Sequence, residues 1–130
     1  MRVKKVLVAL TMLMIFLIPL NVSASEITPQ ASGWQLVGSE SHYYTANKNL
    51  RTRGYSAVDG DNFKIDVYAT KKSGTFSASI FVNGIYRSSS GIALNDGFGT
   101  IQFSGLNPGD LVYFDVLSGN NDYIDLKFYD

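Results

Sequence analysis

The sequence has no cysteine, a single histidine and three prolines among its 130 residues. The lack of cysteine excludes disulfides, zinc–thiolate sites, iron–sulfur clusters and a cysteine nucleophile. Having only His42 excludes most histidine-based metal sites and argues against a Ser-His-Asp triad. Charge is balanced as well, with 11 basic and 11 acidic residues. These absences predict a domain that is stabilised by an apolar core alone and carries no catalytic set.

The N-terminal segment has the composition of an export signal. Three basic residues in the first five positions precede the apolar stretch 6–20, and Val22 and Ala24 supply the aliphatic and small residues of a cleavage site. A membrane-spanning helix needs about 20 apolar residues, so this stretch is short for an anchor. We therefore predict a signal peptide over 1–24 and a secreted mature chain, of bacterial type because exported domains elsewhere are usually rich in disulfides.

Removal of this segment changes the charge balance. Eight basic and eleven acidic residues remain, a net charge of about −3. Nucleic-acid binding needs clustered positive charge, so nucleic acid is not an expected partner. No second apolar run could span a membrane. Residues 25–32 are polar and predict a flexible lead-in, followed by one domain over 33–130.

Alternation of apolar and polar residues dominates the rest of the chain, as in strands with one buried face. No segment has the period of an amphipathic helix. The alternating segments are 63–69, 76–82, 101–103, 112–116 and 124–128.

Tight-turn sequences separate these segments. Asn83-Gly84 predicts a type I′ hairpin turn, because both positions need a positive φ. In Asn107–Asp110, Pro108 and Gly109 predict a type II turn. Short strands at this spacing predict an all-β fold, a small antiparallel β-sandwich of seven to eight strands, either Ig-like or jelly-roll-like.

The N-terminal third has a weaker pattern. Trp34–Val37 predicts a first strand and Tyr43–Thr45 a second. Residues 46–53 are polar and predict a loop, and 55–58 lead into the next strand.

One turn resembles a known family. The segment Leu106–Tyr113, Leu-Asn-Pro-Gly-Asp-Leu-Val-Tyr, is similar to the Leu-x-Pro-Gly-x-x-Tyr turn of fibronectin type III and related Ig-like domains, with the tyrosine one residue late. The resemblance covers eight residues and implies a sandwich. The order of strands and turns also resembles the small jelly-roll modules of secreted bacterial proteases. No functional residue follows from either resemblance.

The candidate catalytic residues are few. His42 lacks a Gly-x-Ser-x-Gly partner motif, and most acidic residues lie in turns or face outward on strands. We therefore predict no enzyme, no cofactor and no metal site. A structural calcium ion in the turn Asp59-Gly-Asp61-Asn62 stays an open alternative.

The predicted contact surface is the polar loop and its neighbours. Arg51 and Arg53 suit anion or sugar contacts, and the nearby Tyr43 and Tyr44 offer rigid contact area. Phe81 and Tyr86, beside the Asn83-Gly84 turn, form the next candidate surface. We predict a small non-enzymatic binding module whose ligand is a cell-wall polymer, a glycan or another extracellular protein. The alternatives are an exported antagonist such as a bacteriocin, toxin or inhibitor and, third, an extracellular hydrolase. The oligomeric state stays open.

Overall fold

The computed structural model describes residues 33–57 and 59–130. The predicted signal peptide, the predicted lead-in and Val58 lie outside these residues. Within them the chain consists of strands and turns, so they contain no helix that could cross a membrane.

Nine strands make up the described domain. They are β1 (Leu36–Tyr44), β2 (Asn49–Arg51), β3 (Tyr55–Ser56), β4 (Asn62–Ala69), β5 (Ser73–Val82), β6 (Ile85–Asn95), β7 (Phe98–Ser104), β8 (Leu111–Ser118) and β9 (Asp122–Tyr129).

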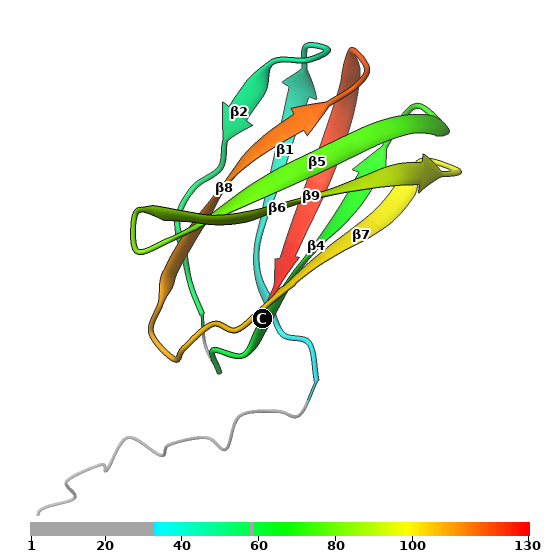
Figure 1. The fold of residues 1–130 in the computed structure, drawn as a ribbon. Coiled ribbons are helices and arrows are strands. Elements are labelled where there is room, and N and C mark those ends of the chain that lie inside the picture. The colour runs from blue at the N-terminus through cyan, green and yellow to red at the C-terminus, as the bar shows by residue number, and fades with distance from the viewer. Residues whose placement is uncertain (1–32, 58) are drawn as a thin grey trace, which may run out of the picture.

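The strands form two layers that face each other (Figure 1). One layer has the order β1-β9-β4-β7 and is called the β4 layer below; the other has the order β6-β5-β8-β2 and is called the β5 layer. Every pairing is antiparallel, and the layers are joined where β6 and β7 pair at Asn95 and Phe98.

This strand order decides between the two sandwich types. β2 and β3 both pair with β8, so they form one interrupted strand and the sandwich has eight strand positions. The first and last strands pair with each other in one sheet. In the Ig fold the first and last strands lie in different sheets, whereas two four-stranded sheets of this kind form a jelly roll. The predicted β-sandwich is confirmed, in its jelly-roll form.

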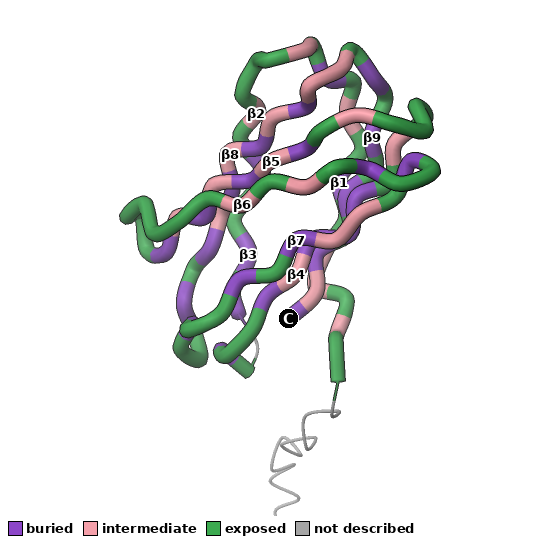
Figure 2. The backbone as a smooth tube through the Cα atoms, turned by 45° about the vertical axis from the view of Figure 1, so that its right-hand side comes forward, coloured by how far each residue is buried: buried purple, intermediate pink, exposed green. Residues whose placement is uncertain are grey.

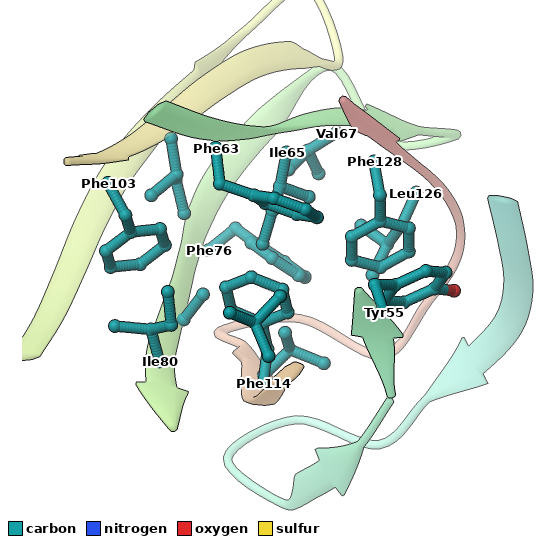
Figure 3. Packing of buried hydrophobic residues seen from close by; sticks show 14 of the residues in the cluster. Tyr55, Phe63, Ile65, Val67, Phe76, Ile80, Phe103, Phe114, Leu126 and Phe128 are labelled. Carbon is teal, nitrogen blue, oxygen red and sulfur yellow. The ribbon is translucent and has the colours of Figure 1, made fainter. Parts of the chain in front are cut away.

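An aromatic cluster fills the space between the layers (Figure 3). The Phe114 ring of β8 lies 5.4 Å from that of Phe63, 5.6 Å from that of Phe103 and 5.8 Å from that of Phe128, measured between ring centroids. These three partners belong to the opposite layer. Along β5 and β8, buried residues alternate with residues that face outward (Figure 2), as the sequence pattern predicts.

Both predicted turns are present. Asn83 and Gly84 have φ values of 51° and 86°, the two positive angles of a type I′ turn. In the second turn, Gly109 has a φ of 83° and the amide of Asp110 donates to the carbonyl of Asn107 at 3.0 Å. This is the type II geometry predicted from the proline and glycine.

The prediction for the N-terminal third is wrong in two respects. The two strands expected at 34–37 and 43–45 are one continuous strand, β1, which pairs with β9. The expected loop 46–53 contains β2, which pairs with β8 through Asn49–Arg51. Hydrogen bonds to the neighbouring strands hold these polar segments in the sheets, and an apolar alternation is not needed at a sheet edge. Tyr113 does not sit over the turn as in the Ig-like resemblance, since its ring stacks on Phe81.

Candidate binding site

The four residues predicted to form a contact surface lie in different places. Tyr44 is 2% exposed and its ring packs edge-on against Phe76, so Tyr44 belongs to the core. Tyr43 is 64% exposed and pairs with Tyr123 on the outer face of the β4 layer. Only Arg51 and Arg53 stay close together. The single surface expected from the sequence is therefore divided.

Thr52 fixes the segment that carries the two arginines. Its amide donates to the carbonyl of Phe114 at 2.9 Å, and its hydroxyl oxygen accepts from the amide of Phe114 at 3.0 Å. The same hydroxyl donates to the carbonyl of Arg53 at 2.9 Å. Thr52 is buried and thereby anchors the segment to β8, which leaves the arginine on each side of it at the surface.

Arg51 forms a bidentate ion pair with Asp115 on the outer face of the β5 layer. Its Nε and Nη2 donate to Oδ1 and Oδ2 of Asp115 at 2.8 and 3.0 Å. This hydrogen bonding lowers the pKa of Asp115 and raises that of Arg51, so both groups stay ionised. The guanidinium carbon also lies 4.8 Å from the centroid of the Tyr113 ring and 5.3 Å from that of Phe81, within the range of cation–π contacts.

Three aromatic residues, here called the ring strip, cross three neighbouring strands beside this ion pair. Tyr113 of β8 is opposite Phe81 of β5, and Phe81 is opposite Tyr86 of β6. The Tyr113 and Phe81 rings are stacked at 4.8 Å, and the Phe81 and Tyr86 rings meet edge-on at 5.8 Å. Tyr86 is 57% exposed, so the strip offers an accessible aromatic end.

A polar row runs parallel to the ring strip, two residues away along β5 and β8. It consists of Arg51, Asp115, Ser79 and Ser89, which follow one another across β2, β8, β5 and β6. The hydroxyls of Ser79 and Ser89 lie 2.7 Å apart, and the Tyr86 hydroxyl lies 3.0 Å from that of Ser89. We call the ring strip and the polar row together the platform. The platform therefore presents aromatic rings along one row and hydrogen-bonding groups along the other.

A hollow of about 430 Å³ adjoins the platform where the edges of the two layers meet. Arg53 lines it, and its amide and Nε donate to Oε1 of Glu40 at 3.0 and 3.1 Å. The Glu40 side chain is only 5% exposed. The residues that line this edge hollow are Ser39, Glu40, Ser41, His42, Arg51, Thr52 and Arg53.

The inward side of β1 explains why the edge hollow is polar. Glu40, His42 and Tyr44 are opposite Leu126, Ile124 and Asp122 of β9 and turn toward the interior. Burial, with the charge of Glu40 nearby, raises the pKa of Tyr55 to about 12. Burial is also the main cause of the raised pKa of Tyr44. Both phenols therefore stay neutral to a higher pH than exposed tyrosines do.

His42 and several acidic residues lie in two separate hollows, the edge hollow and a second one. His42, half-buried, lies edge-on to Tyr44 at 6.3 Å. A second hollow of about 330 Å³ contains Asp59, Asp61 and Asp130, and the amide of Asp59 donates to Oδ2 of Asp130 at 2.7 Å. Across 33–57 and 59–130 there is no group of three or more histidine or acidic side chains placed to hold a metal ion.

The outer face of the β4 layer also carries aromatic side chains. Lys64 lies over the rings of Trp34 and Tyr129 at 5.2 and 4.6 Å, and Lys127 lies over that of Tyr68 at 5.2 Å. Trp34 and Tyr68 stay 43% and 39% exposed beside these lysines. Tyr43 and Tyr123 are exposed on this face, so they are the rings that can be compared with the exposed Tyr86 of the platform.

No model of a known protein family matches this sequence, and no curated protein matches it. Several solved structures are similar. A CBM36 carbohydrate-binding module in complex with calcium and xylotriose is 13% identical, with a TM-score of 0.43, over 75% of this chain and 92% of the module. The CBM6 module of Cellvibrio mixtus lichenase 5A, in complex with cellotriose, is 12% identical, with a TM-score of 0.42, over 74% and 89%. The C-terminal domain of EclA, a sugar-binding protein, is 12% identical, with a TM-score of 0.39, over 79% and 83%. TM-scores this low carry no conclusion about the ligand of this chain, and the jelly-roll assignment rests on the strand order above.

The sequence pointed to part of the platform. Composition and turn position indicate Arg51, Phe81 and Tyr86. Asp115 and Tyr113 were missed, because they reach Arg51 only through the pairing of β2 with β8. The alternation of β8 does place both on its outward face, which is the one signal the sequence contains for them.

Proposed function

We propose that this protein is a small secreted module, of bacterial type, that binds a glycan on the platform and catalyses no reaction. The observation that carries the proposal is the ring strip lying in register beside the polar row, on one outward face of a rigid sheet. Rings supply apolar contact to the C–H faces of a sugar, and the adjacent donors and acceptors suit its hydroxyls.

The dimensions of the sheet support a chain-like ligand. Neighbouring strands lie about 4.8 Å apart, so the four strands that carry the polar row span roughly 14 Å. That length accommodates a short run of sugar units lying across the strands. The backbone of the face is held by the strand pairing, which reduces the ordering cost of binding.

The carboxyl group on the platform fits a module that binds without catalysis. Glycoside hydrolysis uses two carboxyl groups on opposite sides of the scissile bond. Asp115 is the acidic side chain of the platform, and both of its oxygens are held by Arg51.

Binding to polysaccharides tests the proposal. The Tyr86→Ala variant should bind an insoluble glycan at least about fivefold more weakly than the unaltered protein, since a well-placed aromatic contact contributes about 1–3 kcal/mol. The control is Tyr123→Ala, which removes a similarly exposed ring from the other outer face. Equal binding by the two variants, or loss of binding only in Tyr123→Ala, would place the contact elsewhere.

Export is tested separately. Intact-mass analysis of the protein in the culture medium should give a chain that begins at Ser25, as the cleavage site after Ala24 predicts. A mass that retains residues 1–24 would contradict the secreted form.

A further inference from the structure

We infer that the platform selects an uncharged glycan, and that Asp115 sets this selectivity by cancelling the charge of Arg51. The inference rests on the proposed glycan binding and adds the class of ligand. It also departs from what an arginine-rich loop suggests in sequence, namely an anionic polymer.

The geometry of the Arg51–Asp115 pair carries the first step. The pair is bidentate, with both carboxylate oxygens engaged at 2.8 and 3.0 Å. A guanidinium has five N–H donors, so three remain for a ligand after Asp115 has taken two. Those three can bind neutral hydroxyls. A ligand carboxylate or phosphate, in contrast, would be attracted by Arg51 and repelled by Asp115. Because the two charges lie side by side, the attraction and the repulsion largely cancel.

The charge of Arg53 is also balanced by a carboxylate. Arg53 gives its Nε and its amide to Glu40 and its Nη2 to the carbonyl of Ser39 at 2.9 Å. The edge hollow is therefore polar without a net positive charge. The sequence placed Arg51 and Arg53 in one basic loop, and the fold supplies each of them with its own carboxylate.

Two further basic residues, Arg87 and Lys48, are exposed near the site, and neither is among the residues that form the platform. Arg87 lies in β6 beside the ring strip, and its charge acts on Asp110. Lys48 is exposed in the turn between β1 and β2. The rest of the platform consists of serine hydroxyls and aromatic rings, which suit a neutral sugar chain.

The test compares neutral and anionic polymers. Retention is measured by affinity gel electrophoresis on hydroxyethyl cellulose and arabinoxylan, which are neutral, and on carboxymethyl cellulose and polygalacturonate, which are anionic. Each is run at low and at high salt. The unaltered protein should be retained by a neutral polymer, more than by its anionic counterparts, and with little effect of salt.

The Asp115→Asn variant removes the negative charge that balances Arg51. It should gain roughly tenfold in retention on an anionic polymer, because hydrogen bonds to charged groups are worth more than neutral ones. High salt should abolish this gain. Asp125→Asn is the matched control, since it removes one negative charge from the outer face of the β4 layer and should gain nothing.

Each outcome is decisive. Preference of the unaltered protein for the anionic polymers, or a folded Asp115→Asn variant without a gain, would overturn the inference while glycan binding stands. Retention of neither protein by any of the polymers would overturn the proposed function as well. If Asp115→Asn does not fold, Arg51→Gln gives the answer: it should weaken retention on the neutral polymer at least about threefold by removing donors, and unchanged retention would refute the inference.

Discussion

Thr52 offers the sharpest test of how the arginine segment is held. Replacing Thr52 by valine keeps the shape of the side chain and removes only the hydroxyl. The amide of Phe114, which donates to that hydroxyl at 3.0 Å, then loses its partner inside the protein. An orphaned buried donor costs about 1–3 kcal/mol, and loss of the 2.9 Å bond to the carbonyl of Arg53 adds to this.

A destabilisation of about 2 kcal/mol is therefore expected for Thr52→Val, which lowers the melting temperature by roughly 8 °C or more in a domain of this size. Urea denaturation followed by circular dichroism measures it, with the midpoint shifted and the m-value unchanged. Thr45→Val is the control, because Thr45 is exposed and such changes stay within about 0.5 kcal/mol. Equal stability of the two variants would refute the bridging role of the Thr52 hydroxyl.

Three further predictions concern the rest of the fold. Phe114→Ala should lower the free energy of unfolding by about 3–5 kcal/mol in urea denaturation, because its ring is fully buried among three others; a cost below about 1 kcal/mol would contradict the packing. Gly97→Ala should destabilise more than Gly84→Ala in thermal melts: both glycines have a positive φ, but only at Gly97 would a Cβ meet backbone, the carbonyl oxygen of Ala69 at 2.5 Å. Acid should destabilise the protein. Hydrogen bonds lower the pKa of Asp115 and Asp110 in the folded state, so their contribution is complete above the unfolded value of about 3.9 and is lost as the pH falls through the lower folded values. A urea midpoint that stays constant or rises below about pH 4 would contradict this.

Alternation and turn chemistry were enough to predict the body of the sandwich. In β5, Phe76, Ala78, Ile80 and Val82 face inward as their spacing indicates. The Asn83-Gly84 turn needed only local backbone preferences. These features depend on neighbouring residues, which is why a single sequence reveals them.

Alternation and turn chemistry did not predict the strands at the sheet edges. β1 turns Glu40 and His42 inward at positions where a sandwich strand normally carries apolar residues. β2 is three residues long, and its place depends on pairing with β8, more than 60 positions further along the chain. Pairings this distant are not encoded in local periodicity, so the sequence identified Arg51 and not the carboxylate that neutralises it.

Ligand contacts are expected to gather on the platform. The most direct measurement is a titration of the ¹⁵N-labelled protein, followed by amide chemical shifts, with a soluble hexasaccharide of the neutral polymer that retains it. The largest shifts are expected on the platform residues and their direct neighbours, namely on Arg51, Ser79, Phe81, Tyr86 and Asp115. Largest shifts around Tyr43, Tyr68 and Tyr123, on the outer face of the β4 layer, would contradict this expectation.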